Sequence, residues 1–320
     1  MKNNLFLCTA MLLIYGAQSF GINDAVKEGQ NFQSAITWEP NGGRFGDNLL
    51  SYSKAKWLSY RHQIPLLYLP FPHSDELIMH EQENIYTTNY LQLFSHVMHL
   101  PQSSHYKLLP NSNTLYISHW KTDVVIDWFD AVFIKELKKN IMPRYPIEKV
   151  IIPDGCVSIA VHVRNGGGFV VDNEQEKERC PLRFVPDEFF IAQVERLAKM
   201  FENEKLYVHI FTDHLEPAEL LTKFKKALKN YQITFGCRME ENNHKLNVLE
   251  DFFSMMEFDC LVRPGSHYSR FVQRLGNNKV VIYPESVKKL TNGKSIIDVI
   301  AIKKRPNSNT RWKTKKIVIA

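Results

Sequence analysis

The second half of the chain alternates short apolar, β-branched runs with amphipathic stretches. The apolar runs predict strands at 157–163, 206–211, 231–235, 259–262 and 279–283. The stretches between them predict helices at 187–202, 217–229, 246–258 and 267–275. Strands that alternate with helices are typical of a parallel, doubly wound sheet. We therefore expect an α/β fold with a Rossmann-like domain at residues 151–302.

The first half is less regular but begins in the same way. A strand ends at Trp38, and a turn containing Gly42 and Gly43 follows it. The pattern then predicts helices at 48–62 and 127–140 and strands at 66–69 and 114–118. Residues 70–112 are rich in His, Pro and Ser, which indicates loops over a cleft. A second Rossmann-like domain is therefore expected at 20–150, with a boundary in the proline-containing stretch 143–153.

The first 19 residues have the pattern of a secretory signal peptide. Lys2 supplies the positive charge, an apolar run extends from Leu5 to Tyr15, and Ala17-Gln18-Ser19 forms a small-x-small cleavage site. The alternative is an uncleaved segment that anchors the protein to a membrane. No later window reaches the length of a transmembrane helix, so we expect no membrane span in the mature chain. The sequence leaves the oligomeric state open.

The mature chain would retain four cysteines, whose state the sequence does not determine. An even number in an exported protein is compatible with disulfides, while cysteines beside predicted strands are equally compatible with buried free thiols. Because no Cys-x-x-Cys spacing occurs, a structural zinc site is not expected. The four residues are Cys156, Cys180, Cys237 and Cys260.

Composition excludes global disorder, and the position of the charge argues against nucleic acid as a partner. Of the 320 residues, 44% are apolar, which is enough to form a core. The net charge is +6, but residues 303–320 hold seven Lys and Arg and no acid, which leaves residues 1–302 at −1. We expect this basic tail to be a solvated extension, or alternatively to attach to an anionic surface or glycan.

The strongest local signal for chemistry is the run from Val157 to Gly168. A buried strand carries His162 and Arg164 to its carboxyl end, where Gly166 and two more glycines follow. Ligands of doubly wound folds bind at this end of the strands. Glycines let the backbone approach phosphate oxygens, and an arginine can bind a diphosphate with two hydrogen bonds. A flexible turn with a solvated arginine, and a buried structural histidine, are the alternatives.

Three further polar groups follow the later strands. Thr212 and Asp213 end the second strand, where they could also serve only as a helix cap. Asp251 lies on the helix before the fourth strand. Ser266 begins the next helix, whose free backbone N–H groups are suited to an anion, although it could also be an ordinary N-cap. No Asp-x-Asp motif is present, so we expect no metal to hold a diphosphate.

These motifs resemble, in order, those of the GDP-fucose-dependent fucosyltransferase superfamily. The C-terminal ones are Arg164 in His-Val-Arg, Thr212-Asp213, Asp251-Phe252-Phe253 and the run Gly265–Arg270. The run Gly42–Leu49 is similar to the N-terminal turn of that superfamily. The resemblance covers roughly residues 36–285. It implies a GT-B-like fold, in which the domain at 20–150 faces the acceptor and the domain at 151–302 binds the nucleotide sugar.

The resemblance also implies an activity, namely metal-independent transfer of fucose from GDP-fucose to a glycan or glycoprotein hydroxyl, with inversion and no cofactor. By this likeness Arg164 binds the β-phosphate and assists departure of the leaving group, and Asp251 contacts guanine. Asp47 is a carboxylate where the family has an amide, which makes it a candidate base. The substrate-binding residues implied in this way are Gly43, Arg44, Asn48, His162, Gly166, Thr212, Asp213, Asp251, Ser266, His267, Ser269 and Arg270.

Two alternatives to this activity stay open at the level of sequence. One is a noncatalytic nucleotide- or glycan-binding protein with the same fold. The other is a different α/β enzyme, whose glycine-rich turn binds another phosphate ligand.

Overall fold

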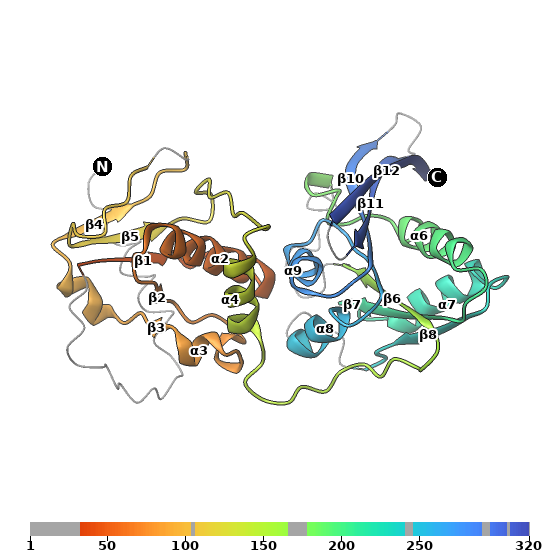
Figure 1. Ribbon diagram of the computed structural model, residues 1–320. Helices are drawn as coiled ribbons and strands as arrows, with labels where there is room; N and C mark the ends of the chain where they lie inside the picture. The colour runs from red at the N-terminus through yellow and green to blue at the C-terminus, as the bar shows by residue number, and fades with distance from the viewer. Residues whose placement is uncertain are drawn as a thin grey trace. The chain divides into compact units, whose positions relative to one another are not determined.

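A seven-stranded sheet forms the second half of the chain (Figure 1). The computed structural model describes residues 33–103, 106–165, 178–240, 246–289, 295–305 and 308–319. The expected signal peptide at 1–19 therefore lies outside the described residues. Gln33–Ala320 forms one compact unit, so the division at residue 150 stays a prediction.

The central part of this sheet is parallel and has the strand order β8-β7-β6-β9-β10. This arrangement confirms the α/β class and the parallel sheet predicted from sequence. The order reverses between β6 and β9, so the loops after these strands diverge and leave room for a ligand. The strands are β6 (Val157–Val163), β7 (Leu206–Thr212), β8 (Ile233–Cys237), β9 (Cys260–Val262) and β10 (Val280–Lys289).

The C-terminal segment extends this sheet. Strand β11 (Ser295–Arg305) pairs antiparallel with β10, and β12 (Ser308–Ile319) pairs antiparallel with β11. The expectation of a solvated basic tail at 303–320 was therefore wrong. Strand β12 is the edge strand of this sheet, so pairing with β11 engages the backbone groups on one of its sides. The density of Lys and Arg in this segment gave no indication of a strand.

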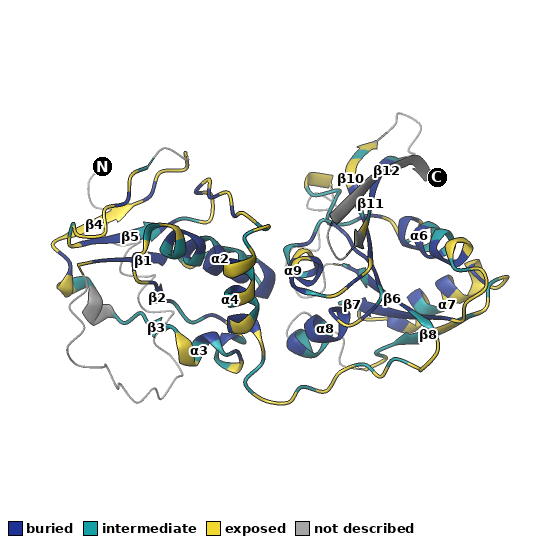
Figure 2. Cartoon of the chain, in the orientation of Figure 1, coloured by how far each residue is buried: buried dark blue, intermediate teal, exposed yellow. Residues whose placement is uncertain are grey.

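Helices cover both faces of the sheet because successive side chains of a strand point to opposite faces. Ile159 and Val161 of β6 pack in one apolar cluster with helices α6 (Asp187–Met200) and α7 (Pro217–Ala227). Ala160, between them, belongs to a second cluster with helices α8 (Val248–Met255) and α9 (His267–Leu275). Strand β7 is buried along its whole length, as Figure 2 shows. The four helices begin within two residues of their predicted starts.

The first half contains a smaller parallel sheet of order β1-β5-β4. Its strands are β1 (Ser34–Trp38), β4 (His96–His99) and β5 (Thr114–Ser118), and a single bridge from Ile36 to Leu66 leads toward the pair β2 (Leu67–Tyr68) and β3 (Asn84–Ile85). The two helices predicted for this half are α2 (Phe45–His62) and α4 (Ala131–Ile141). Helix α2 begins three residues earlier than expected, which brings Asp47 into its first turn.

Residues 70–112 are more ordered than the expected loops. They contain the 3₁₀ helices η1 (Ser74–Glu76) and η2 (Thr88–Leu93) and helix α3 (Met79–Gln82), besides β3 and β4. The four cysteines are free thiols, of which Cys260 is buried. Among the described residues, none of the helices has the length and apolar character needed to cross a membrane.

Candidate functional site

A pocket lies at the carboxyl ends of β6 and β7, beside the first turns of α2 and α9. This is the edge of the sheet at which parallel α/β folds bind ligands. Nine of the residues expected to bind substrate or act in catalysis line the pocket, although they come from separate parts of the chain. They are Arg44, Asp47, His162, Arg164, Thr212, Asp213, Asp251, Ser266 and His267.

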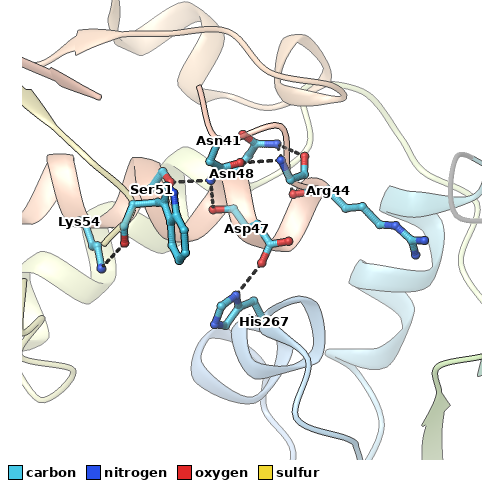
Figure 3. A network of polar contacts seen from close by, with 9 residues as sticks. Asn41, Arg44, Asp47, Asn48, Ser51, Lys54 and His267 are labelled. Atoms are coloured by element: carbon cyan, nitrogen blue, oxygen red, sulfur yellow. Dashed lines mark hydrogen bonds and ion pairs between the residues drawn. The ribbon is translucent and has the colours of Figure 1, made fainter. Parts of the chain in front are cut away.

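A hydrogen bond joins the two helix starts at this pocket. Oδ1 of Asp47, in the first turn of α2, lies 2.6 Å from Nδ1 of His267, the first residue of α9 (Figure 3). The contact requires Gly46, because a Cβ atom there would lie 2.7 Å from the Cα of Tyr268. The glycine of the N-terminal motif thus permits close packing of α2 against α9.

The contact with His267 lowers the pKa of Asp47. Burial alone would raise the pKa of Asp47, but the hydrogen bond and charge of His267, with the charges of Arg183 and Arg164, outweigh it and lower that pKa below its usual value of 3.8. Asp47 is therefore an ionised acceptor at neutral pH. The facing Nδ1 of His267 therefore donates the hydrogen bond, and the second ring nitrogen, Nε2, is directed away from Asp47.

Three arginines line the same pocket: Arg44, Arg164 and Arg183. Burial lowers the pKa of Arg164 to about 10, and the charges of Arg44 and Arg183 act in the same direction. Its Nε is buried and makes no hydrogen bond with any described residue. The guanidinium therefore keeps an unused donor beside two further arginines, which favours binding of an anion.

Asp213 holds the turn around these cations. One of its oxygens lies 3.1 Å from Nη1 of Arg44, and the other accepts a hydrogen bond of 2.6 Å from the backbone N–H of Asn165. Thr212 accepts the N–H of His214 at 3.1 Å. Thr212 ends β7 and Asp213 follows it directly, and their contacts indicate that they position the loops after β6 and β7.

Two further polar atoms in the pocket lack a partner within the described part of the chain. The hydroxyl of Ser266 is buried and does not cap α9, although Ser266 occupies the N-cap position. Nδ1 of His162 is also buried without a hydrogen bond, and burial lowers the pKa of this side chain to about 4, so it is neutral at pH 7. Buried polar groups of proteins are normally satisfied, and a bound ligand would satisfy these.

Asp251 adds a carboxylate to the lining of this pocket. It lies in the first turn of α8 and contacts Nη2 of Arg238 at 3.3 Å. Burial raises the pKa of Asp251 to about 6, in spite of the opposing effect of Arg238. Because ionisation is disfavoured in the free protein, hydrogen-bond donors from a ligand would stabilise the carboxylate form.

The remaining site residues predicted from sequence do not line this pocket. The side-chain amide of Asn48 donates to the carbonyl oxygens of Gly43 (2.7 Å) and Arg44 (3.2 Å), so these residues form the turn before α2. Ser269 is fully buried, and its hydroxyl has no partner among the described residues. Arg270 lines a second cavity. Gly166 lies outside the described residues.

Several lining residues were missed by sequence reasoning. Arg183 lies in the loop after β6, where a backbone hydrogen bond of 2.5 Å from Gly265 to Leu182 fixes the chain. Arg183 follows a predicted strand of the sheet, which could have marked it as a site residue. Its charge alone, however, does not distinguish it from an ordinary surface arginine. Phe45 and Tyr268 also line the pocket, with ring centroids 6.2 Å apart; both lie within the motif runs named above but were not assigned to the site.

The pocket combines the guanidinium groups and unused hydrogen-bond donors described above with the carboxylate of Asp251, which lies on helix α8. This combination is suited to a ligand with a diphosphate and a base that presents N–H groups. Within the described residues, no group of three His, Cys, Asp or Glu side chains could hold a metal ion.

No family model and no curated protein matches the sequence. Among solved structures, the similar ones include apo POFUT1 (12% identity, TM-score 0.46, covering 77% of this chain and 96% of that one). A mutant of Arabidopsis thaliana FUT1 with GDP is 14% identical, with a TM-score of 0.49 and coverage of 85% and 73%. NodZ, an alpha-1,6-fucosyltransferase soaked with GDP-fucose, is 13% identical, with a TM-score of 0.45 and coverage of 88% and 99%.

Proposed function

We propose that this protein is a glycosyltransferase that moves fucose from GDP-fucose to a hydroxyl of a glycan or glycoprotein, with inversion and without a metal. The observation that carries the proposal is the convergence of Arg164, Arg183 and the unpartnered hydroxyl of Ser266 at the reversal point of the sheet. Asp251 lines the same pocket and gives it a means to select the base.

The cations would stabilise the leaving group. When the bond between the sugar and the diphosphate breaks, negative charge develops on the β-phosphate and positive charge on the sugar ring. Fixed donors around that phosphate lower the barrier because they are already oriented before charge develops. Arg164 offers a guanidinium with an unused Nε, and Ser266 offers a hydroxyl at the start of α9. The first backbone N–H groups of a helix have no partner within the helix and can add further donors.

The carboxylate of Asp251 would select guanine. Guanine presents a ring N–H and an exocyclic amine side by side, and one carboxylate can accept from both. Uracil and adenine do not present that pair of donors. Binding of guanine would also stabilise the charged form of Asp251, which burial disfavours in the free protein.

The pair formed by Asp47 and His267 would activate the acceptor. Asp47 orients the imidazole through Nδ1, so Nε2 is the atom that takes the proton from the acceptor hydroxyl. The base is then the histidine, and Asp47 is its positioning residue, in contrast to the expectation that Asp47 itself accepts the proton. Asp47 is poorly suited to that role because its pKa is lowered.

Nucleotide-dependent thermal stabilisation tests the proposal. GDP at about 100 times its dissociation constant should stabilise the fold by roughly 2.7 kcal/mol, and UDP and ADP at the same concentration should stabilise it less. The measurement is made with EDTA and repeated with Mg²⁺ or Mn²⁺. Equal shifts for the three nucleotides, or a shift that needs the metal, would contradict a GDP-fucose site.

Transfer is then measured as GDP release from GDP-fucose with a panel of glycan acceptors. Release that depends on an acceptor supports the enzyme. Selective GDP binding without release across the panel would favour the noncatalytic nucleotide-binding protein. Binding of another nucleotide in preference to GDP would favour a different α/β enzyme.

We further propose that the protein is exported or enters the secretory pathway through residues 1–19, with membrane anchoring by an uncleaved segment as the alternative. The signal pattern supports this proposal. A glycan acceptor is consistent with such a compartment.

A further inference from the structure

A second cavity of about 260 Å³ adjoins the same pair of helices. Three arginines line it: Arg263 at the end of β9, and Arg270 and Arg274 on α9. Trp128 and Tyr283 provide aromatic walls. The cavity therefore combines a concentration of positive charge with flat apolar surfaces.

Two of the three guanidinium groups lie over aromatic rings, and none of the three has an acidic partner among the described residues. Arg263 is 3% exposed, and its Cζ lies 4.2 Å from the centroid of the Tyr283 ring. The Cζ of Arg274 lies 5.1 Å from the Trp128 ring. In the described ranges, no carboxylate forms an ion pair with Arg263, Arg270 or Arg274. Their positive charge is therefore not neutralised by the described protein.

Arg263 is the most constrained of the three. Its Nε donates to Gln273 at 2.7 Å and its Nη1 to the carbonyl oxygen of Pro264 at 2.9 Å, so neutral acceptors hold its orientation. Burial lowers the pKa of Arg263 to about 9, and repulsion from Arg270 and Arg274 adds to this effect. A buried cation without an anion is costly, and an anionic ligand would remove much of that cost.

The cavity lies beside the first pocket along both helices. On α2, Asp47 lines the pocket and Leu50 lines the cavity; on α9, His267 lines the pocket and Arg270 lines the cavity. Three residues of helix correspond to about 4.5 Å along its axis. This separation is comparable to the length of one sugar unit, so an acceptor glycan with its reactive hydroxyl at His267 would place its next unit at the arginines.

We propose that the cavity formed by Arg263, Arg270, Arg274, Trp128 and Tyr283 binds an anionic substituent, a carboxylate or a sulfate, on the acceptor glycan. That the ligand is the acceptor rests on the proposed function, but binding of an anionic glycan at the cavity can be measured separately. The aromatic rings would contact the apolar face of the sugar that carries the charge. The substrate class would then be acidic glycans.

Binding of defined oligosaccharides to the intact protein tests the inference without transfer. We would compare oligogalacturonate, a sulfated chondroitin tetrasaccharide, its unsulfated counterpart and neutral chitotetraose by calorimetry at 150 mM NaCl, in the absence of nucleotide. We expect at least one of the anionic ligands to bind about tenfold or more tightly than the neutral one, since hydrogen bonds to charged groups are strong. Preference for oligogalacturonate identifies a carboxylate, and preference for the sulfated chondroitin tetrasaccharide over its unsulfated counterpart identifies a sulfate.

Variants separate this site from general attraction to a basic protein. Arg274→Gln removes an exposed charge of the cavity and should abolish most of the anionic preference while GDP binding stays unchanged. Arg61→Gln removes one exposed charge at the end of α2 and is the matched control. Equal affinity for neutral and anionic ligands, or equal losses in both variants, would overturn the inference. If GDP is selected but no acidic glycan is preferred, this inference fails while the proposed function stands.

Discussion

Arg164 is the residue on which the leaving-group argument depends most directly. Arg164→Ala should lower the rate of transfer by about 10²–10³ fold, because it removes an oriented donor from the developing phosphate charge. Arg164→Lys should recover little of the rate, since a lysine lacks the planar fork of donors. The rate constant for GDP release at saturating substrate measures both effects.

The control for this residue is Arg61→Ala, which removes one exposed positive charge on α2. It should leave the rate unchanged. A turnover near that of the wild type in Arg164→Ala, with the fold intact by circular dichroism, would remove Arg164 from the mechanism.

The contact between Asp47 and His267 predicts that the effects of replacing them on kcat are coupled. If they act as one unit, Asp47→Asn and His267→Gln should each lower kcat on the order of 10² fold, and the double variant should be little worse than either single one. The kcat values of the wild type, the two single variants and the double variant are measured with saturating donor and acceptor. Losses that multiply in the double variant would show that the two side chains act independently.

Asp251 predicts a dependence of nucleotide preference on pH. Its pKa of about 6 means that the carboxylate becomes protonated as the pH falls through 6 and can no longer accept both guanine donors. The affinity for GDP relative to UDP should therefore fall about tenfold between pH 7.5 and pH 5. UDP is the reference because both ligands carry the same titrating diphosphate.

Asp251→Asn serves as the control for that measurement. An amide does not titrate in this range, so the ratio of GDP to UDP affinity should be lower at pH 7.5 and independent of pH. A ratio that changes with pH to the same extent in wild type and variant would assign the effect to another group.

At the scale of elements, the packing of α2 on α9 sets the site. Gly46→Ala would place a Cβ atom 2.7 Å from the Cα of Tyr268 and force the two helices apart. We expect it to lower the free energy of unfolding by about 1–3 kcal/mol. Where the helix surface is open, replacing glycine with alanine has the opposite effect and raises the free energy of unfolding by about 1 kcal/mol. Urea denaturation measures the difference.

Ser59→Ala, in the same helix and outside the pocket lining, provides the comparison for Gly46→Ala. It should change stability only slightly. If Gly46→Ala were as stable as wild type and kept its activity, the close approach of α2 and α9 would not be required for the site.

At the scale of the whole molecule, the signal pattern predicts processing. A chain expressed in a secretory system should have a mature N-terminus near Phe20, because the bond after Ser19 follows a small-x-small motif. N-terminal sequencing of the secreted or fractionated protein measures this directly. Protein that begins at Met1 and remains in the cytosol would contradict the prediction, and Met1 in a membrane fraction would indicate the anchor.

The sequence by itself determined the α/β class, the five parallel strands and the residues at their carboxyl ends. Hydrophobic periodicity is a local property, so the alternation of strands and helices can be read without the fold. Because parallel strands end at one edge, Arg164, Thr212 and Ser266 could be predicted to lie together. The same reasoning failed for the basic segment 303–320, since strand pairing at β12 depends on a partner and not on charge.

Only the tertiary structure decided which side chains meet across long stretches of chain. Asp47 and His267 are 220 residues apart, and their pairing follows from the contact at Gly46. Arg183 enters the pocket because a loop is fixed by a backbone contact with Gly265. The three arginines of the second cavity come together only when β9 and α9 pack beside Trp128. Such contacts depend on how elements pack, and a local pattern does not encode that packing.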